Sequence, residues 1–433
     1  MNTPPKKGVA VCGEISMKLK SKKDNLWDVV VIGGGPAGMM AAGRAAERGK
    51  SVLLLEKNKA LGKKLLITGG GRCNVTNNKP VVREMLSKYK GNDQFLFSAF
   101  SQFSVADALK FFNDRGMATK EENEGRIFPV SNKAQSVWEV LVRYMKKNDV
   151  EIRNDAEVTG ISADGEYIQI KLKGAAGIRA RACVLATGGT SRPETGSTGE
   201  GFLWLKKLGH TIIDNDFALV PVALKDAWAK KIGGVALTDI KLTTFQNGQK
   251  QEMYKGKLLF THFGISGPTV LNMSKELGEL LQYGEVTISL DLFPKLDAGA
   301  LKQKLQDLLV AGSNKKLKNV LSNLVPAALV APLLELAQID GETANHSVRS
   351  ADRAKLVALM KAIPLHVQGL LGAEKAVVSS GGVALEEVNF KTMQSRLVPN
   401  LYLVGDVLNV DRPSGGYSLQ LCWTTGYVAG ENS

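Results

Sequence analysis

Three glycines and one acidic residue near the start of the chain have the types and the spacing of a nucleotide-binding site. Gly33, Gly35 and Gly38 form a GxGxxG pattern, and Glu56 follows about twenty residues later. Glycines in this order permit a tight turn, a close approach of the backbone to a pyrophosphate, and close packing of a helix on a strand. Since the carboxylate would accept both ribose hydroxyls, the pattern predicts a dinucleotide whose ribose carries no phosphate.

The same stretch contains the elements that would position these residues. Asp28–Ile32 is an apolar, β-branched run typical of a buried strand, and Pro36 and Ala37 begin a helix whose free N–H groups would face the phosphates. A second strand, Ser51–Leu55, would deliver Glu56 to the ribose. A glycine-rich loop in an unrelated α/β turn is the alternative, but it does not explain the two strands and the acid together.

Three later segments place glycines, cations or an acid at expected strand ends. The first reads TGGGRCNVTN from Thr68, and its consecutive glycines would let the backbone lie against a flat ring or a phosphate. The second, RACVLATGG from Arg181, is a buried strand that runs into glycines. The third, LYLVGD from Leu401, is a strand that ends in an acid.

The second and third segments resemble the later fingerprints of FAD-binding proteins of the glutathione-reductase structural class. In that class the first of them lies near FAD, and the acid holds ribitol and phosphate groups, so the resemblance favours FAD over NAD. Val158 would touch the adenine through its backbone, although a plain core valine explains it equally well. Besides the residues already named, the expected cofactor contacts are Lys57, Lys64, Gly70, Gly71, Arg72, Cys73, Asn74, Val158, Thr187, Gly188, Gly189, Gly405, Asp406, Gly415, Gly416, Tyr417 and Ser418.

Five longer motifs resemble a bacterial family of FAD-dependent oxidoreductases. They read TGGGRCNVTN, GRIFPVSNKA, LATGGTSRPETGSTGEGF, LFTHFGISGP and KTMQSRLVPNLYLVGDVLNVDRPSGGYSLQL. Members include aminoacetone oxidase-like proteins and reductases of unsaturated 3-oxo bile-acid intermediates. Two positions depart from the family, which often has Glu where Asp406 stands and Gly where Arg412 stands. The long cation at 412 is expected to alter the approach to the flavin.

Length and composition predict a folded cytoplasmic protein of two or three domains. The chain has 433 residues, 44% of them apolar, and no apolar run approaches the roughly twenty residues that cross a bilayer. Residues 1–25 lack the apolar core of a signal peptide and are interpreted as a tail. The scattered cysteines favour a reducing compartment, and they exclude the paired-thiol mechanism of disulfide reductases. They are Cys12, Cys73, Cys183 and Cys422.

The expected fold is α/β, with a discontinuous Rossmann-like FAD-binding domain interrupted by two inserts. Short strands such as Ala236–Phe245 indicate a β-rich insert, and apolar residues every three or four positions, as at Leu301 and Leu305, indicate a helical one. Strands are expected again at Ala376–Ser379 and Leu401–Val404. The predicted boundaries are 26–191 and 368–433 for the FAD-binding domain, 192–295 for the β-rich insert and 296–367 for the helical insert.

Three residues are candidates for chemistry on a substrate. His262, within THFGISGP, could donate a proton, although a histidine at such a turn is more often a structural hydrogen-bonding group. Tyr417 is a second candidate acid, and by resemblance the helix beginning near Ser418 would aim its N-terminus at the pyrimidine edge of the flavin. Arg126 could clamp a carbonyl or carboxylate, or simply pair with a nearby acid. No metal-site spacing, GxSxG elbow or Walker loop is present.

These features predict an FAD-dependent oxidoreductase in which NADH or NADPH reduces the flavin, and the reduced flavin then reduces a small conjugated enone. With one GxGxxG in the chain, the nicotinamide would dock transiently over the flavin. The alternatives are a flavin-dependent, aminoacetone-like amine oxidase, a non-catalytic flavin sensor, and an RNA-interacting flavoprotein suggested by the net charge of +14. Because the lysines are dispersed and no basic run is interleaved with aromatics, nucleic acid and membrane are not expected as partners.

Overall fold

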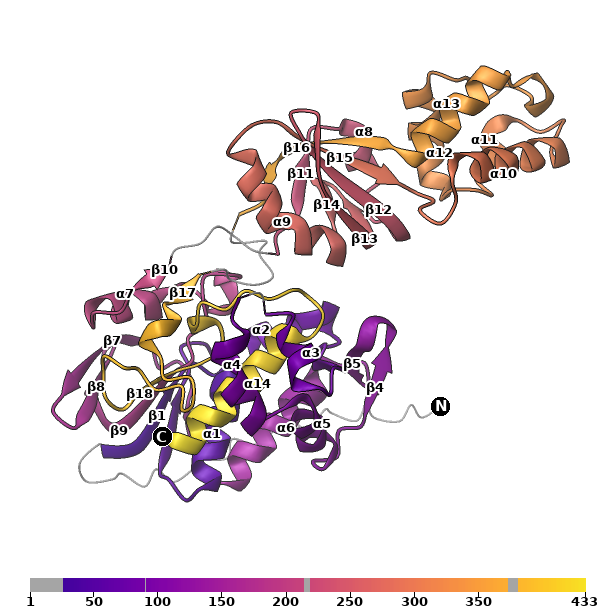
Figure 1. Ribbon diagram of the computed structural model, residues 1–433. Coiled ribbons are helices and arrows are strands. Elements are labelled where there is room, and N and C mark those ends of the chain that lie inside the picture. Colours follow the sequence, from indigo (N-terminus) through magenta and orange to yellow (C-terminus); the bar gives the residue numbers. More distant parts are fainter. Residues whose placement is uncertain (1–25, 90, 214–218, 373–380) are drawn as a thin grey trace, which may run out of the picture.

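The computed structural model describes residues 26–89, 91–213, 219–372 and 381–433. The expected tail over residues 1–25 and the expected strand Ala376–Ser379 lie outside these ranges. Figure 1 shows three parts in a row: a Rossmann-like part, a barrel, and a group of helices at the far end of the barrel. Among the described residues, no helix is long and apolar enough to cross a membrane.

A sheet of seven strands is the centre of the Rossmann-like part, which comprises residues 26–213 and 381–433. Its strand order is β6-β2-β1-β9-β8-β7, and β18 pairs with β9. Strand β1 is parallel to both neighbours, with Val29 opposite Val52 on one side and Ala182 on the other. Strands β1, β2 and β18 are runs of apolar residues because both faces of the parallel part of the sheet are covered, whereas β8 is antiparallel to β9 and to β7. The bounds are β1 Leu26–Ile32, β2 Val52–Leu55, β6 Glu151–Arg153, β7 Val158–Asp164, β8 Tyr167–Leu172, β9 Ile178–Leu185 and β18 Leu401–Leu403.

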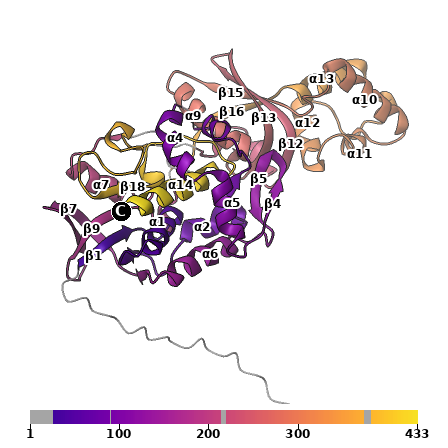
Figure 2. The same ribbon diagram turned by 60° about the horizontal axis from the view of Figure 1, so that its bottom comes forward.

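Helices and a small second sheet complete this part, and the expected Rossmann-like α/β fold is confirmed. The helix of the glycine turn, α1, lies beside the C-terminal helix α14 in Figure 1 and Figure 2. The helices are α1 Pro36–Glu47, α2 Lys63–Ile67, α3 Val82–Leu86, α4 Asp93–Gln102, α5 Val105–Asn113, α6 Ala134–Lys147, α7 Glu200–Lys207 and α14 Tyr417–Asn432, and the small sheet has β3 Thr76–Asn77, β4 Thr119–Glu122 and β5 Arg126–Pro129.

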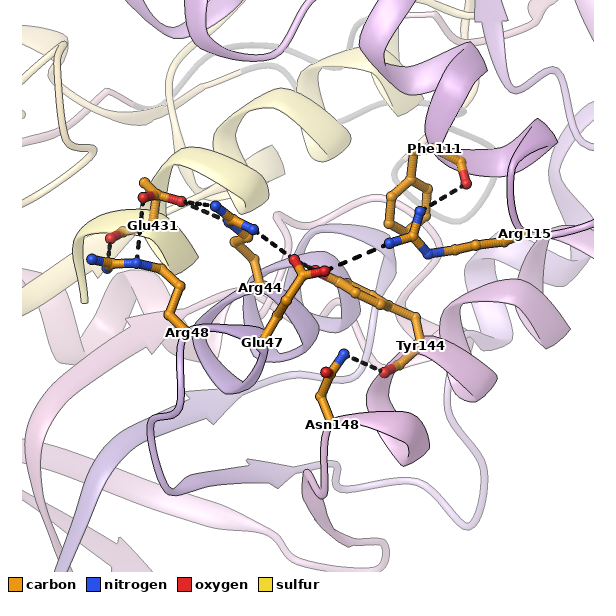
Figure 3. Close-up of polar contacts among 8 residues, drawn as sticks. All are labelled: Arg44, Glu47, Arg48, Phe111, Arg115, Tyr144, Asn148 and Glu431. Atoms are coloured by element: carbon orange, nitrogen blue, oxygen red, sulfur yellow. Dashed lines mark hydrogen bonds and ion pairs between the residues drawn. The ribbon is translucent and has the colours of Figure 1, made fainter.

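A cluster of charged side chains ties the C-terminal end of α1 to its neighbours (Figure 3). Arg44 contacts Glu431 on α14 and, at 2.6 Å, Glu47 on its own helix. Glu47 also accepts a hydrogen bond of 2.7 Å from the hydroxyl of Tyr144 on α6, and Arg115 lies 3.8 Å from its other oxygen. The cluster therefore joins α1, α6 and α14, and with them the first and last parts of the chain.

Residues 192–213 pack with the Rossmann-like part. The sequence had predicted that this part ends at residue 191, so the observed boundary differs from the predicted one. Trp204 and Leu205 on α7 belong to its hydrophobic core. Strand β10, Ile212–Ile213, pairs with β17, Gly382–Val383, so the chain leaves this part after β10 and returns before β17. Side-chain packing thus places the boundary about twenty residues later than the change in sequence texture.

A closed barrel forms the middle part, in the order β11-β14-β13-β12-β15-β16. Buried and half-exposed residues alternate along its strands, as on β15, where Val286, Ile288 and Leu290 point inward. The barrel contains β11 Val222–Leu224, β12 Ala236–Gln246, β13 Gln249–Thr261, β14 Gly264–Ser266, β15 Val286–Asp291 and β16 Ile363–Leu370, with helices α8 Ala227–Lys231 and α9 Pro268–Leu281.

The distal helices are an insertion between two barrel strands. They follow β15 and precede β16, so β16 begins inside the range that the sequence assigned to a helical insert and ends inside the range assigned to the FAD-binding domain. Leu301, Leu356 and Met360 share one hydrophobic core with the barrel residues Ile363 and Leu365. The helices are α10 Ala298–Ala311, α11 Leu317–Leu321, α12 Ala327–Ala337 and α13 Ser350–Lys361.

Candidate cofactor site

The glycine turn after β1 makes a cradle at the N-terminus of α1. A Cβ on Gly33, whose φ is +105°, would lie 2.5 Å from the Ala186 carbonyl oxygen, and one on Gly38 would lie 2.0 Å from the Gly33 oxygen. Packing therefore requires these two glycines. A Cβ on Gly35 would meet nothing within 4 Å, so the middle glycine faces open space. This arrangement fits a pyrophosphate at the N-terminus of α1.

A cavity that is open to solvent lies over this cradle, with about 910 Å³ of space between the protein atoms when the solvent at its mouth is included. It runs along the carboxyl ends of β2, β1, β9 and β18, where ligands bind in sheets of this type. The buried Thr187 hydroxyl at its edge has no hydrogen-bond partner among the described residues, as expected for a group that serves a ligand. The expected cofactor residues that line the cavity are Gly33, Gly35, Pro36, Ala37, Glu56, Lys57, Lys64, Val158, Thr187, Gly188, Gly405 and Asp406.

Glu56 is held in place at one end of the cavity. Its side chain is buried (7% exposed) at the end of β2. One carboxylate oxygen accepts a hydrogen bond of 2.8 Å from the Gly34 amide, and the other accepts bonds of 2.8 and 2.7 Å from the Asn58 amide and side chain. The carboxylate is thus fixed beside Val158, on the side of α1 where the sequence pattern expects the adenosine ribose.

The segment of residues 195–200 also lines the cavity, which sequence reasoning did not predict. Lys57 donates to the Thr198 hydroxyl at 2.9 Å and forms an ion pair with Glu200 at 3.0 Å. Asn58 donates to the Thr195 carbonyl at 3.1 Å. Lys57 therefore holds this segment against the cavity. The motif containing ETGSTGEG was visible in the sequence, but nothing in its composition linked it to the loop after β2.

The opposite end of the cavity is strongly charged. Lys64 donates to the Ser191 hydroxyl at 3.1 Å, and burial lowers the pKa of its amine although Asp406 nearby favours the charged form. Arg412 pairs with Asp406, and its side chain is only 1% exposed. The guanidinium is buried against Asp406, and Arg412 is not among the residues that line the cavity. The expected influence of Arg412 on the approach to the flavin stays a prediction.

The TGGGRCNVTN segment does not line the cavity. Arg72 pairs with Glu122, donates to Asn132 at 2.8 Å, and lies 4.2 Å from the centre of the Phe128 ring. Cys73 is fully buried, and burial raises the pKa of its thiol to about 12. The other expected contacts outside the cavity lining are Gly38, Gly70, Gly71, Asn74, Gly189, Gly415, Gly416, Tyr417 and Ser418.

Tyr417 and Arg126 lie on two segments that Asn77 joins. Asn77 donates to the Gly415 carbonyl at 3.1 Å, just before Tyr417, and pairs with Arg126 across β3 and β5. Tyr417 is buried (6% exposed) at the start of α14, and burial raises the pKa of its hydroxyl. Arg126 donates to the Asn123 carbonyl at 3.0 Å and lies 3.7 Å from Glu124, so its guanidinium holds its own loop.

His262 is not brought to the cavity. Its exposed side chain lies in the turn between β13 and β14 and contacts the Phe263 ring. Strand β14 pairs with β11 so that Val222 opposes Ile265 and Ala223 opposes Gly264. Because β11 enters the barrel from the Rossmann-like part at Val222, this turn lies at the other end of β11. His262 and Tyr417, the two expected proton donors, are therefore on separate parts of the molecule.

A serine, a histidine and a glutamate form a triad-like array elsewhere in the Rossmann-like part. His210 lies 2.9 Å from the Ser395 hydroxyl and 2.8 Å from Glu387. His210 and Ser395 are buried, whereas Glu387 is partly exposed, and none of the three lines the cavity. The serine oxygen accepts hydrogen bonds from two backbone amides. A hydroxyl so occupied is a poor nucleophile, so the array joins the segment before β18 to the residues after α7.

The parallel strands β6, β2, β1, β9 and β18, the glycine cradle and the acid at the end of β2 define a dinucleotide-binding protein of the Rossmann type. Residues 27–432 match the family described as HI0933-like protein Rossmann domain, and the chain belongs to this family. The membership confirms the FAD-dependent oxidoreductase that the motifs predicted. The residues that line the cavity fit FAD.

Two relatives match along nearly their whole length. The ribosomal RNA dihydrouridine synthase of Escherichia coli (strain K12) is 32% identical over 409 residues, which cover 94% of this chain and 98% of the relative. The 3-dehydro-bile acid delta(4,6)-reductase of Clostridium scindens is 32% identical over 404 residues, which cover 92% and 97%. Among solved structures, the 3-ketosteroid-delta4-(5alpha)-dehydrogenase of Rhodococcus jostii RHA1 superposes with a TM-score of 0.53 at 16% identity, covering 95% of this chain and 98% of that one, a likeness of fold.

Proposed function

We propose that this enzyme reduces a carbon–carbon double bond conjugated with a carbonyl group in a small molecule, with NADH or NADPH as the electron donor. The observation that carries the proposal is the 32% identity, over almost the full chain, to a 3-dehydro-bile acid delta(4,6)-reductase. The three cysteines of the described residues support it, because they are buried and unpaired, so that the described part of the chain holds no thiol pair that could act as an acceptor.

The residues have distinct tasks in this proposal. Bound FAD supplies hydride-transfer chemistry. The backbone at Gly35 and the N-terminus of α1 bind its pyrophosphate, and Glu56 binds its adenosine ribose. A tyrosine hydroxyl carries its proton at neutral pH, and burial raises the pKa of Tyr417 further, so we assign to this hydroxyl the proton that goes to the α-carbon of the substrate. The barrel and the distal helices are not needed to hold FAD, and we assign substrate selection to them.

A uridine in RNA is the second candidate substrate. The E. coli relative is named a ribosomal RNA dihydrouridine synthase, and the net charge of +14 favours a polyanion. Reduction of uridine to dihydrouridine also saturates a double bond conjugated with a carbonyl group. The two candidates therefore share the chemistry and differ in what surrounds the reacting bond.

Anaerobic flavin spectroscopy on the purified holoenzyme tests the proposal. NADH or NADPH should bleach the visible flavin absorbance, and a steroid 4-en-3-one should restore it, whereas the matching saturated ketone should not. Uridine-containing RNA is the second acceptor, with a gel shift at low salt to detect its binding. Reoxidation by RNA alone would replace the first candidate with the second. Bleaching by aminoacetone and by neither nicotinamide would refute both and identify an amine oxidase.

The proton donor is tested in the same assay. Replacing Tyr417 by phenylalanine should slow reoxidation by the enone about 100-fold or more, the usual contribution of a general acid, and leave bleaching by the nicotinamide unchanged. Tyr283→Phe is the matched control, since Tyr283 is 75% exposed on the barrel. Equal reoxidation rates in the two variants would remove Tyr417 from the mechanism.

A further inference from the structure

Arg412 is a buried cation that contacts the cavity wall without lining the cavity. Its guanidinium uses all three nitrogens: Nη2 donates to Asp406, Nη1 donates to the Val410 carbonyl at 2.6 Å, and Nε donates to the Ser418 hydroxyl at 3.1 Å. Asp406 lines the cavity, and Ser418 lies in the first turn of α14. One side chain therefore connects the acid at the end of β18 to the start of the C-terminal helix.

The topology shows which half of the cofactor lies nearest to this pair. The cavity crosses the ends of β2, β1, β9 and β18 in that order, because β18 pairs with β9 on the side away from β2. Glu56 follows β2 and the pyrophosphate cradle follows β1. If the adenosine lies at Glu56, the flavin half extends past Thr187 toward Asp406. Arg412 then stands behind the end of the cavity that receives the redox-active half.

A positive charge at this end matters because reduction changes the charge of the flavin. Two electrons and one proton convert bound FAD to its anionic reduced form, which carries one more negative charge on the ring system. Charges near the ring are one means by which proteins tune flavin electronics, and their effect is larger in a buried site than in water. The negative charge of Asp406 alone would disfavour the extra negative charge of the reduced flavin, and the positive charge of Arg412 cancels this repulsion.

The segment that carries Arg412 is also fixed from the barrel side. Its neighbour Asp411 forms an ion pair with Lys275 on α9, and the Ser414 amide donates to Asn272 on the same helix at 2.9 Å. Contacts from two parts of the molecule therefore limit the freedom of Arg412 to move away from Asp406.

We propose that Arg412 is a positioning residue that raises the reduction potential of bound FAD, by fixing the Asp406 carboxylate and balancing its charge with a buried cation. The inference concerns the cofactor and holds for either candidate substrate.

The midpoint potential of the FAD-loaded enzyme, measured by dye-coupled titration, tests the inference. In Arg412→Gln, reduced FAD should bind about tenfold less tightly relative to oxidised FAD, a fall of about 30 mV for a two-electron couple. Arg412→Lys keeps the positive charge, so its midpoint potential should fall by less than half as much as that of Arg412→Gln. The double variant Asp406→Asn/Arg412→Gln removes both charges and should return close to the wild-type potential. Arg349→Gln, which breaks the exposed Arg349–Asp352 pair on α13, is the matched control and should change nothing.

Two outcomes would overturn the inference. One is an Arg412→Gln enzyme that keeps its FAD and its near-ultraviolet circular dichroism yet has the wild-type potential. The other is a double variant whose potential falls as far as that of the single variant, because the cause would then be a disturbed loop. If Arg412→Gln does not retain FAD, the Asp406→Asn variant tests the inference instead. This variant leaves the positive charge of Arg412 without its partner, so the midpoint potential of bound FAD should rise. An unchanged midpoint potential would refute the proposed role of Arg412.

Discussion

The close crossing of α1 and α14 gives the most direct test of how packing supports the cofactor site. A Cβ on Gly426 of α14 would lie 2.4 Å from the carbonyl oxygen of Ala37 in the first turn of α1. Side-chain carbons do not approach backbone atoms closer than 3.0 Å, so Gly426→Ala must separate the helices by at least 0.6 Å, the difference of the two distances. Ala37 itself lines the cavity, so the separation reaches the cofactor.

The size of the effect follows from two opposing contributions. Overpacking a close contact typically costs about 1–3 kcal/mol, and replacing a helical glycine by alanine returns up to about 1 kcal/mol through helix propensity. A net loss of about 1–2 kcal/mol is expected in the free energy of unfolding. If the same displacement is felt at the cradle, FAD should bind roughly 5- to 30-fold more weakly, because about 1.4 kcal/mol corresponds to a factor of ten.

Urea unfolding and titration of the apoprotein with FAD measure the two effects. Gly299→Ala is the matched control, since Gly299 is an exposed glycine in the first turn of α10, where an added Cβ would meet only an oxygen of the capping Asp297 carboxylate, at 3.3 Å. This control should be neutral or slightly stabilising. A Gly426→Ala protein as stable as the control, with unchanged FAD affinity, would refute the claim that this crossing sets the position of α1.

Two further predictions concern titrating groups. Burial alone would raise the pKa of Glu47, but hydrogen bonds from Tyr144 and Arg44 hold this pKa below 4.5 in the folded protein. The ionised carboxylate therefore stabilises the fold above pH 4.5, and this stabilisation is lost as the pH falls through the pKa of Glu47 in the folded state. Glu47→Gln should therefore lose less stability on acidification than the wild type, measured by urea unfolding on both sides of pH 4.5; parallel curves would contradict this. Burial also raises to about 12 the thiol pKa of the three described cysteines, Cys73, Cys183 and Cys422. Iodoacetamide should therefore label none of them in the folded protein. Peptide mapping that finds label on one of them would show that the structure opens around that thiol.

Local patterns predicted the parts of the site whose causes are local. The tight turn at Gly33 and the strand that delivers Glu56 depend on residues close together in sequence, and the structure places both at the cavity. Lys64 and Asp406 were predicted from the resemblance to a known family, because resemblance carries information on contacts between residues that are far apart in the sequence. By contrast, Arg72 carries a charge that suits a phosphate, but its pairing with Glu122 depends on two strands meeting, which no local pattern states.

The boundaries of the two inserts also depend on contacts that local sequence patterns do not predict. The texture of the sequence changes near residue 192, but Trp204 and Leu205 pack into the Rossmann-like core, because burial is decided by the tertiary structure. Strand β16 follows four helices and still closes the barrel beside β15. Which chain segments meet across such an insertion could not be deduced from periodicity alone.

The joining of the two ends of the chain has a consequence for biosynthesis. The cradle forms from residues 26–56, whereas β18 and α14 follow every other described element along the chain. A growing polypeptide in which residues 401–432 have not yet been made has the first strand and its glycines but lacks the wall that carries Asp406. Loading with flavin must therefore await the synthesis of these residues, and a product cut short before β18 would be recognised by its lack of colour.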